Sequence, residues 1–187
     1  MHVLYAKTQG VLGGALSGIA TFTRDDSGTV TPDMNNWFTL GARQAGKLAG
    51  LDYRVEYYHQ LGDAGTIANS SGYGITGATT QGDSVDRDAN MFGIRVGKKL
   101  GKGAITLWYD RLSGVDDDDQ TGGDWGAFDT MFDTGHKFYG FQDFYLSRTG
   151  AGTRFFGLQD IALKTKMSPR AGWTLKADLH HFRTATD

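Results

Sequence analysis

The sequence predicts an all-β protein, an antiparallel up-and-down transmembrane β-barrel with about 8 strands in this chain. Three observations predict it. Segments of about ten residues alternate apolar and polar side chains, as strands with two different faces do. Four short polar turns join these segments in pairs, and much longer loops rich in Gly, Asp, Ser and Thr separate the pairs. Short turns at one end and long loops at the other are typical of outer-membrane barrels.

The first hairpin is predicted over 2–8 and 14–23, where glycines blur the alternation. The second is predicted over 37–44 and 51–60, and its second strand has the clearest period of two. The two sides of that strand are Leu51, Tyr53, Val55 and Tyr57 on one face, and Asp52, Arg54, Glu56, Tyr58 and Gln60 on the other.

The third hairpin is predicted over 90–98 and 104–112, joined by a glycine-containing turn. The fourth is predicted over 155–165 and 173–181. Pro169 falls in the last turn, where its missing N–H removes no ladder hydrogen bond. In both hairpins apolar residues such as Ile94 alternate with polar, charged or small ones, so each strand again has two chemically distinct faces. Trp108, on the polar face of 104–112, departs from this simple alternation.

The connections predicted on the opposite end are long: 24–36, 61–87 and 113–154. Soluble domains rarely carry structureless loops of this length, whereas outer-membrane barrels do so on their outer face. We therefore expect 1–187 to form a single barrel segment of four hairpins. Strand-like patterns run up to both chain ends, so we also expect a piece truncated at both ends of a longer polypeptide.

The composition agrees with many strands and few helices: 28 Gly, 2 Pro and 12% aromatic residues among 187. The hydrophobic fraction of 39% suits a barrel, in which only every second strand residue meets lipid. No apolar run approaches the roughly 20 residues that a transmembrane helix needs. A net charge of −2 gives no indication of a nucleic-acid partner, and the absence of cysteine excludes disulfides and thiolate metal sites.

Charged residues recur on one face of the predicted strands. Arg or Lys near the middle of the lipid-facing side costs about 2–4 kcal/mol, so this face is expected to line a hydrated channel. The alternative is a soluble sandwich with the same charges facing water. The predicted pore-lining residues are Lys7, Arg43, Asp52, Arg54, Glu56, Arg95, Asp110, Asp160, Lys164, Lys176 and Asp178.

Aromatic residues on the apolar face lie where interfacial girdles belong, although aromatics favour strands in any case. Tyr57, Tyr109 and Trp173 are predicted near strand ends, and Tyr53 shares their face. These four side chains are the expected girdle.

Few residues suggest catalysis or metal binding. The run Asp116, Asp117, Asp118 and Asp119 is a weak Ca²⁺ candidate, because Ca²⁺ takes clustered oxygens, but a solvated acidic loop is the simpler interpretation. His180 and His181 point to opposite faces of one strand, so they cannot share a metal there. No G-x-S-x-G, H-E-x-x-H or phosphate-loop context is present, and neither an enzyme nor a cofactor is predicted.

Residues 128–145, FDTMFDTGHKFYGFQDFY, resemble a segment of the alginate-export family of outer-membrane porins, and HKFYGF at 136–141 is the most specific part. LWYDRLSGVDDDD at 107–119 and KADLHHF at 176–182 resemble strands and a loop of the same family. The resemblance covers the second half of the chain well and the first half mainly by architecture.

The resemblance implies a monomeric barrel of about 18 strands in the outer membrane of a Gram-negative cell. Its basic lumen would pass an anionic polyuronate such as alginate, or another anionic or polar solute, among outer-membrane lipid and lipopolysaccharide. The loop 113–154 would help to form the entrance or constriction. The residues expected there are Asp133, His136, Lys137, Tyr139 and Asp143.

Two other functions remain open from the sequence. One alternative is a barrel that encloses a partner complex as a scaffold instead of conducting solute. The other alternative is a soluble β-sandwich that binds carbohydrate through aromatics such as Trp125 and Tyr139.

Overall fold

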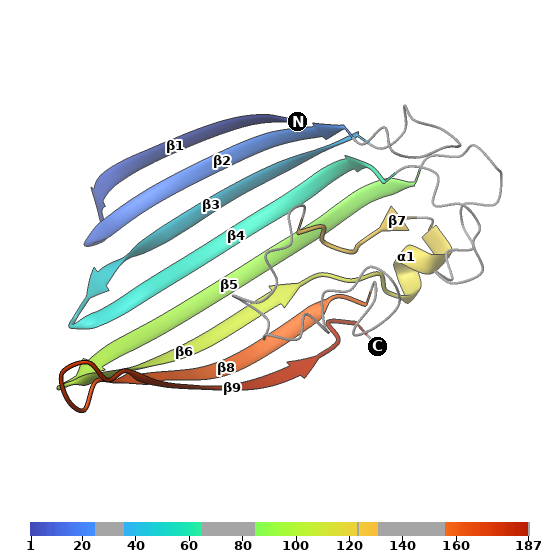
Figure 1. The fold of residues 1–187 in the computed structure, drawn as a ribbon. Coiled ribbons are helices and arrows are strands. Elements are labelled where there is room, and N and C mark those ends of the chain that lie inside the picture. The colour runs from blue at the N-terminus through green and yellow to red at the C-terminus, as the bar shows by residue number, and fades with distance from the viewer. Residues whose placement is uncertain (25–35, 65–84, 123, 131–155, 187) are drawn as a thin grey trace.

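The computed structural model describes residues 1–24, 36–64, 85–122, 124–130 and 156–186 (Figure 1). Strands consecutive along the chain are neighbours in one antiparallel sheet, in the order β1-β2-β3-β4-β5-β6-β8-β9, and the two-residue strand β7 pairs with β5 in parallel. The predicted all-β, antiparallel, up-and-down architecture is therefore confirmed. Among the described residues β1 and β9 do not pair, so the sheet is open.

The strands are long enough to cross a bilayer, which needs about 9–11 tilted residues. Their lengths range from 9 residues in β9 to 15 in β5, apart from β7. The bounds are β1 His2–Val11, β2 Gly14–Arg24, β3 Asn36–Leu48, β4 Leu51–Asp63, β5 Asp86–Leu100, β6 Gly103–Leu112, β7 Asp124–Trp125, β8 Leu158–Met167 and β9 Leu175–Arg183. No helix within these described ranges is long and apolar enough to span a membrane.

Three of the four turns are tighter than the sequence suggested, because the strands pair almost to their ends. Only two residues separate β1 from β2, β3 from β4, and β5 from β6. Leu12 and Gly13 have φ of 47° and 71°, and Ala49 and Gly50 have 50° and 77°. Two successive positive φ values characterise the type I′ turn, whose twist matches paired strands. The turns gather at one end of the sheet (Figure 1).

Several predicted boundaries are wrong at the opposite end and in the last hairpin. β4 continues to Asp63 and β5 begins at Asp86, so strand pairing extends into both ends of the predicted loop 61–87. The predicted loop 113–154 contains a short helix, α1 (Asp117–Gly122), and β7. Trp173 precedes β9 and belongs to the turn, where its backbone N–H donates to Arg170 O at 3.1 Å.

The two faces of the sheet differ in which side chains they expose. One row of the apolar face runs across five strands through Tyr53, Val96, Leu107, Leu163 and Leu179. Leu107 is 62% exposed and Leu179 is 71% exposed. On the polar face Asp110 and Asp160 are both 0% exposed. Charge is buried on one side of this sheet while aliphatic side chains are exposed on the other.

The only buried apolar cluster among the described residues also lies on the polar face. Met91, Leu112 and Leu158 occupy neighbouring positions of β5, β6 and β8, and the partly buried Phe128 packs against them. Phe128 comes from the chain that follows β7, so this cluster attaches that chain to the sheet near the end opposite the short turns. No described layer covers the apolar face.

Candidate functional site

The strand register brings all the predicted pore-lining residues to one face. One row of directly opposed residues crosses the sheet from β1 to β9, and its positions are Lys7, Ser17, Arg43, Glu56, Gly93, Asp110, Asp160 and Phe182. The rows toward the short turns hold Arg54 with Arg95, and Asp52, Lys164 and Asp178. Residues opposed across strands lie about 5 Å apart at Cβ, so these charges interact.

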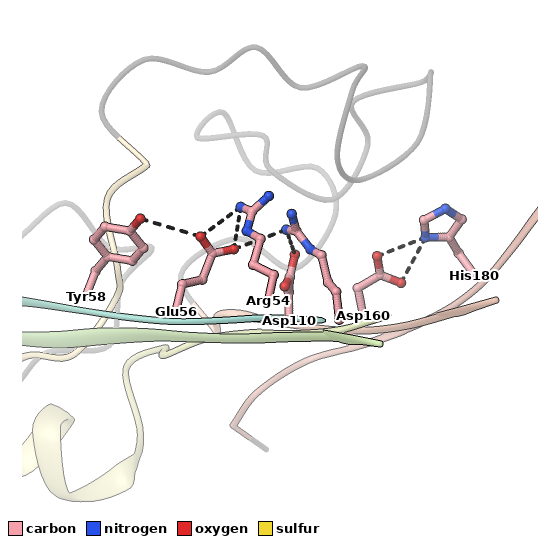
Figure 2. A network of polar contacts seen from close by, with 7 residues as sticks. Arg54, Glu56, Tyr58, Asp110, Asp160 and His180 are labelled. Carbon is pink, nitrogen blue, oxygen red and sulfur yellow. Dashed lines mark hydrogen bonds and ion pairs between the residues drawn. The ribbon is translucent and has the colours of Figure 1, made fainter. Parts of the chain in front are cut away.

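At the centre of the polar face, two arginines and two carboxylates form a connected network (Figure 2). Arg54 Nη2 donates to both oxygens of Glu56, at 2.5 and 2.7 Å. Arg95 Nη2 lies 3.3 Å from Glu56 Oε1 and 3.2 Å from Asp110 Oδ2, so it bridges the two carboxylates. Tyr58 Oη is 3.5 Å from Glu56. Alternating charges of this kind hold one another in fixed positions, because each buried ion has a partner of opposite sign.

Gly93 makes room for this network. It lies between Glu56 and Asp110 in the cross-sheet row. A Cβ at position 93 would come within 2.7 Å of Asp110 Oδ1 and 3.2 Å of Glu56 Oε1. Only glycine therefore lets two buried carboxylates approach from both neighbouring strands.

Trp108 is the aromatic residue of the polar face that departed from the simple alternation in the sequence. The Arg95 guanidinium lies 3.3 Å from its ring centroid, and Lys164 Nζ lies 4.2 Å from the same centroid. Cations are attracted to the negative face of an indole ring. Lys164 in turn is 3.6 Å from Asp178. Trp108 thus extends the central network toward β8 and β9.

A second polar pair joins the last two strands. His180 Nδ1 is 2.9 Å from both oxygens of Asp160 (Figure 2), and the His180 ring stacks on Phe182 at a centroid distance of 5.1 Å. Asp160 is directly opposite Asp110. Sequence reasoning included Asp160 but missed His180, although its even position among Lys176 and Asp178 places it on the same face.

The predicted lining residues differ in their access to water. Glu56, Asp110 and Asp160, which were predicted to line a hydrated channel, are buried. Lys7, Arg43, Lys176 and Asp178 are exposed. Burial of the three carboxylates follows from their partners, since Arg54, Arg95 and His180 lie over them.

Basic residues outnumber acidic ones on the polar face of the described strands. The register assigns ten basic residues to it: Lys7, Arg43, Lys47, Arg54, Arg87, Arg95, Lys99, Lys164, Lys166 and Lys176. The acidic residues are Asp52, Glu56, Asp110, Asp160 and Asp178. The face as a whole therefore has an excess of positive charge.

The excess is greatest near the short turns. Lys99, Lys166 and Lys176 share one row with Ala104 and are exposed. None of the three forms an ion pair with another described residue. This group, the lysine row, is the least neutralised part of the polar face and was only partly anticipated, through Lys176.

The chain after β6 is attached to the polar face by buried hydrogen bonds. Gln60, which is 0% exposed, donates to Asp129 O at 2.8 Å and accepts from Asp129 N at 2.8 Å. Ser113 Oγ donates to Gly126 O at 2.6 Å, and Phe128 N donates to Ser113 O. β7 adds a short parallel pairing to β5. These bonds hold 126–130 over the end of the polar face opposite the short turns.

Replacing Gln60 by alanine is expected to release 126–130 from the sheet. Both backbone groups of Asp129 lose their partner, and each unsatisfied buried group costs about 1–3 kcal/mol. Hydrogen exchange at the amides of 126–130 should therefore accelerate. The matched control is Gln44→Ala, because Gln44 also makes two hydrogen bonds, to Val11 O and Tyr53 Oη, but on the apolar face. Equal protection of 126–130 in the Gln60→Ala and Gln44→Ala variants would contradict the attachment.

The acidic run lies at the start of α1. Asp116 N donates to Asp119 Oδ2 at 3.1 Å, and Asp119 N donates to Asp116 Oδ1 at 2.9 Å. This reciprocal arrangement is a capping box, and carboxylates in a first turn also suit the helix dipole. Burial raises the pKa of the Asp119 carboxyl, while its hydrogen bond from the Asp116 backbone partly offsets the rise. Within the described part of the chain no three His, Asp or Glu side chains are grouped to hold a metal.

The expected aromatic girdle is only partly at strand ends. Tyr53 lies near the short turns, where its hydroxyl donates to Leu12 O at 2.6 Å. Trp173 is in a turn at the same end, with the Arg170 guanidinium 4.4 Å from its ring. Tyr57 lies in the middle of β4, because that strand is longer than predicted. Tyr109 lies three residues before the end of β6.

The predicted constriction residues Asp133, His136, Lys137, Tyr139 and Asp143 lie outside the described residues. The most specific part of the family resemblance, 136–141, lies there as well. No family model, curated protein or solved structure matches this chain.

Proposed function

We propose that this protein forms part of an outer-membrane β-barrel whose polar face lines a channel for an anionic or polar solute. One observation carries the proposal: a single sheet exposes its apolar face and buries charge on the other. Soluble monomers rarely expose contiguous apolar patches larger than a few hundred Å². An exposed apolar face of this kind is stable when it contacts the hydrocarbon of a bilayer. The opposite face, which carries the charges, then has to contact water.

Closure of the sheet follows from the same environment. In a bilayer every backbone N–H and C=O of a spanning strand needs a partner, so an open edge is not stable there. β1 and β9 each present an edge without a partner among the described strands. We propose that further strands pair with both edges and complete a larger barrel, as the resemblance to the alginate-export family implies.

The charges of the polar face favour an anion. Exposed lysines attract it at the short-turn end, which faces the periplasm in bacterial barrels. Arg54 and Arg95 are already paired with carboxylates. Binding at the centre is consequently weak enough for release, which conduction requires. A polyuronate, which carries one carboxylate per sugar, is the proposed solute class.

Neutralising the lysine row tests this function. In planar bilayers the Lys99→Gln/Lys166→Gln/Lys176→Gln variant should show a lower anion-to-cation permeability ratio than the unchanged protein, because fixed charges at a pore mouth set the local ion concentration. Added polyuronate should also block its current less strongly. These residues are exposed and distant from the buried network, so folding should be unaffected.

Lys98→Gln is the matched control. Lys98 is adjacent to Lys99 in the chain but lies on the apolar face. It should leave the permeability ratio unchanged. The channel assignment would be overturned by a triple variant with wild-type selectivity, or by equal effects of Lys98→Gln and Lys99→Gln.

A further inference from the structure

The apolar face carries arginines that the proposed channel does not use, and two of them lie in one row. Arg111 in β6 and Arg183 in β9 flank Gln159 of β8 in one row of directly opposed residues. By strand alternation all three side chains belong to the face that exposes Leu107 and Leu179. Arginine on a lipid-facing surface is costly, so its occurrence there calls for a physical reason.

Neither of these arginines is neutralised by a carboxylate. Arg183 Nε and Nη2 donate to Gln159 Oε1 at 3.1 and 2.8 Å, and Arg111 Nη1 donates to Asn90 Oδ1 at 3.2 Å. Both partners are neutral amides. Arg54 and Arg95 of the polar face differ, since they are paired with Glu56 and Asp110. Among the described residues, Arg111 and Arg183 thus keep their full charge, and Gln159 fixes the Arg183 guanidinium in position.

The row that contains Arg111, Gln159 and Arg183, the arginine row, lies at one end of the apolar part of this face, the apolar band. The next row toward the short turns is Tyr109, Ile161 and His181, and the following one is Leu107, Leu163 and Leu179. Tyr109 Oη donates to Gln159 Oε1 at 3.2 Å, and its ring lies 6.4 Å from that of Phe92. A tyrosine with its ring in the apolar band and its hydroxyl at the polar limit is typical of a membrane interface. At that depth an arginine costs much less than at the middle of the bilayer.

We propose that Arg111, Gln159 and Arg183 bind the phosphate of a lipid head group in the leaflet on the side of the long loops. This inference rests on the proposed function, because it requires the apolar face to meet lipid. Guanidinium groups bind phosphate through parallel, charge-assisted hydrogen bonds, and the Gln159 amide offers an additional N–H donor. In the outer membrane, the phosphorylated lipid of that leaflet is lipopolysaccharide.

A lipid fits this row better than free phosphate for two reasons. The rows of Ile161 and Leu163 continue directly from the arginine row toward the short turns, so acyl chains can lie against them while the phosphate stays at the arginines. Exposed arginines in bulk water bind a single small anion weakly, because salt screens the interaction. The acyl contact strengthens binding further with each CH₂ group that it buries.

The experiment measures lipid binding to the whole chain in detergent micelles by native mass spectrometry. The probes are lipid A, dephosphorylated lipid A and inorganic phosphate. The unchanged protein should retain lipid A at least about 10-fold more strongly than dephosphorylated lipid A, a difference of about 1.4 kcal/mol. Inorganic phosphate at the same concentration should not displace it. This comparison needs no variant, so it stands even where a substitution impairs folding.

Arg111→Gln/Arg183→Gln should bring lipid A retention down to that of the dephosphorylated lipid. Lys98→Gln/Arg170→Gln removes the same charge near the short turns and should leave retention unchanged. Equal retention of both lipids by the unchanged protein would overturn the proposal, and so would displacement by inorganic phosphate. If the protein conducts anions selectively in planar bilayers but retains lipid A and dephosphorylated lipid A equally, the lipid site is rejected and the proposed channel function is not. Loss of insertion altogether would instead reject the proposed function.

Discussion

Leu107→Arg is expected to reduce the folded, bilayer-inserted population by about 30- to 1,000-fold, which corresponds to about 2–4 kcal/mol for arginine near the middle of a lipid-facing strand. Leu107 is in the middle of the apolar face, with Val96 and Leu163 on either side of it, and is 62% exposed. In a water-soluble sheet the same substitution would replace one exposed side chain by another and change stability by less than about 0.5 kcal/mol. The two environments therefore predict clearly different results.

Leu100→Arg provides the control for depth. Leu100 is also exposed on the apolar face but is the last residue of β5, next to the short turn. An arginine at that depth is expected to cost about 0–1 kcal/mol. Urea titration of protein reconstituted in lipid vesicles measures both variants. Equal, small effects of the two substitutions would mean that water, not hydrocarbon, contacts Leu107, and the channel proposal would then be lost.

The strands and their faces could be predicted because a period of two is a local property of the sequence. Asp52, Arg54 and Glu56 alternate with Tyr53 and Val55, and no tertiary information is needed to separate them. Every residue predicted to line the channel lies on one face of the sheet for this reason. The short turns were recognisable from their glycines, although pairing continues closer to the turns than propensity alone indicated.

The contacts between side chains of the polar face could not be predicted in the same way. Which carboxylate meets which arginine depends on strand register, and one residue of slip moves a whole strand to the other face. Arg95 bridges Glu56 and Asp110 only because Gly93 is opposite both. The Gln60–Asp129 hydrogen bonds join residues far apart in the chain and leave no periodic signal. Trp108 was visible as an exception to the alternation, but its two cation partners were not.

Arg95→Met is expected to lower the free energy of unfolding by about 3–5 kcal/mol, the usual effect of removing one partner from a buried ion pair. Asp110 is 0% exposed, and its carboxylate would remain buried without the Arg95 guanidinium. Glu56 would keep Arg54. Adding Asp110→Asn should recover most of the loss, since the second change removes the uncompensated charge while preserving shape. Urea titrations of the two single variants and the double variant give the coupling energy directly.

Arg170→Met is the matched control for that cycle, because Arg170 is exposed in the β8–β9 turn. Its guanidinium lies over the Trp173 ring and forms no hydrogen bond or ion pair with another described side chain. An exposed cation–π contact is worth about 0.5–1 kcal/mol, so the control should lose no more than that. A coupling energy near zero between Arg95 and Asp110 would show that the charges act independently. The pairing of Arg95 with Asp110 would then not stabilise the central network. The argument that an anion binds only weakly at the centre, because the arginines there are already paired, would fail.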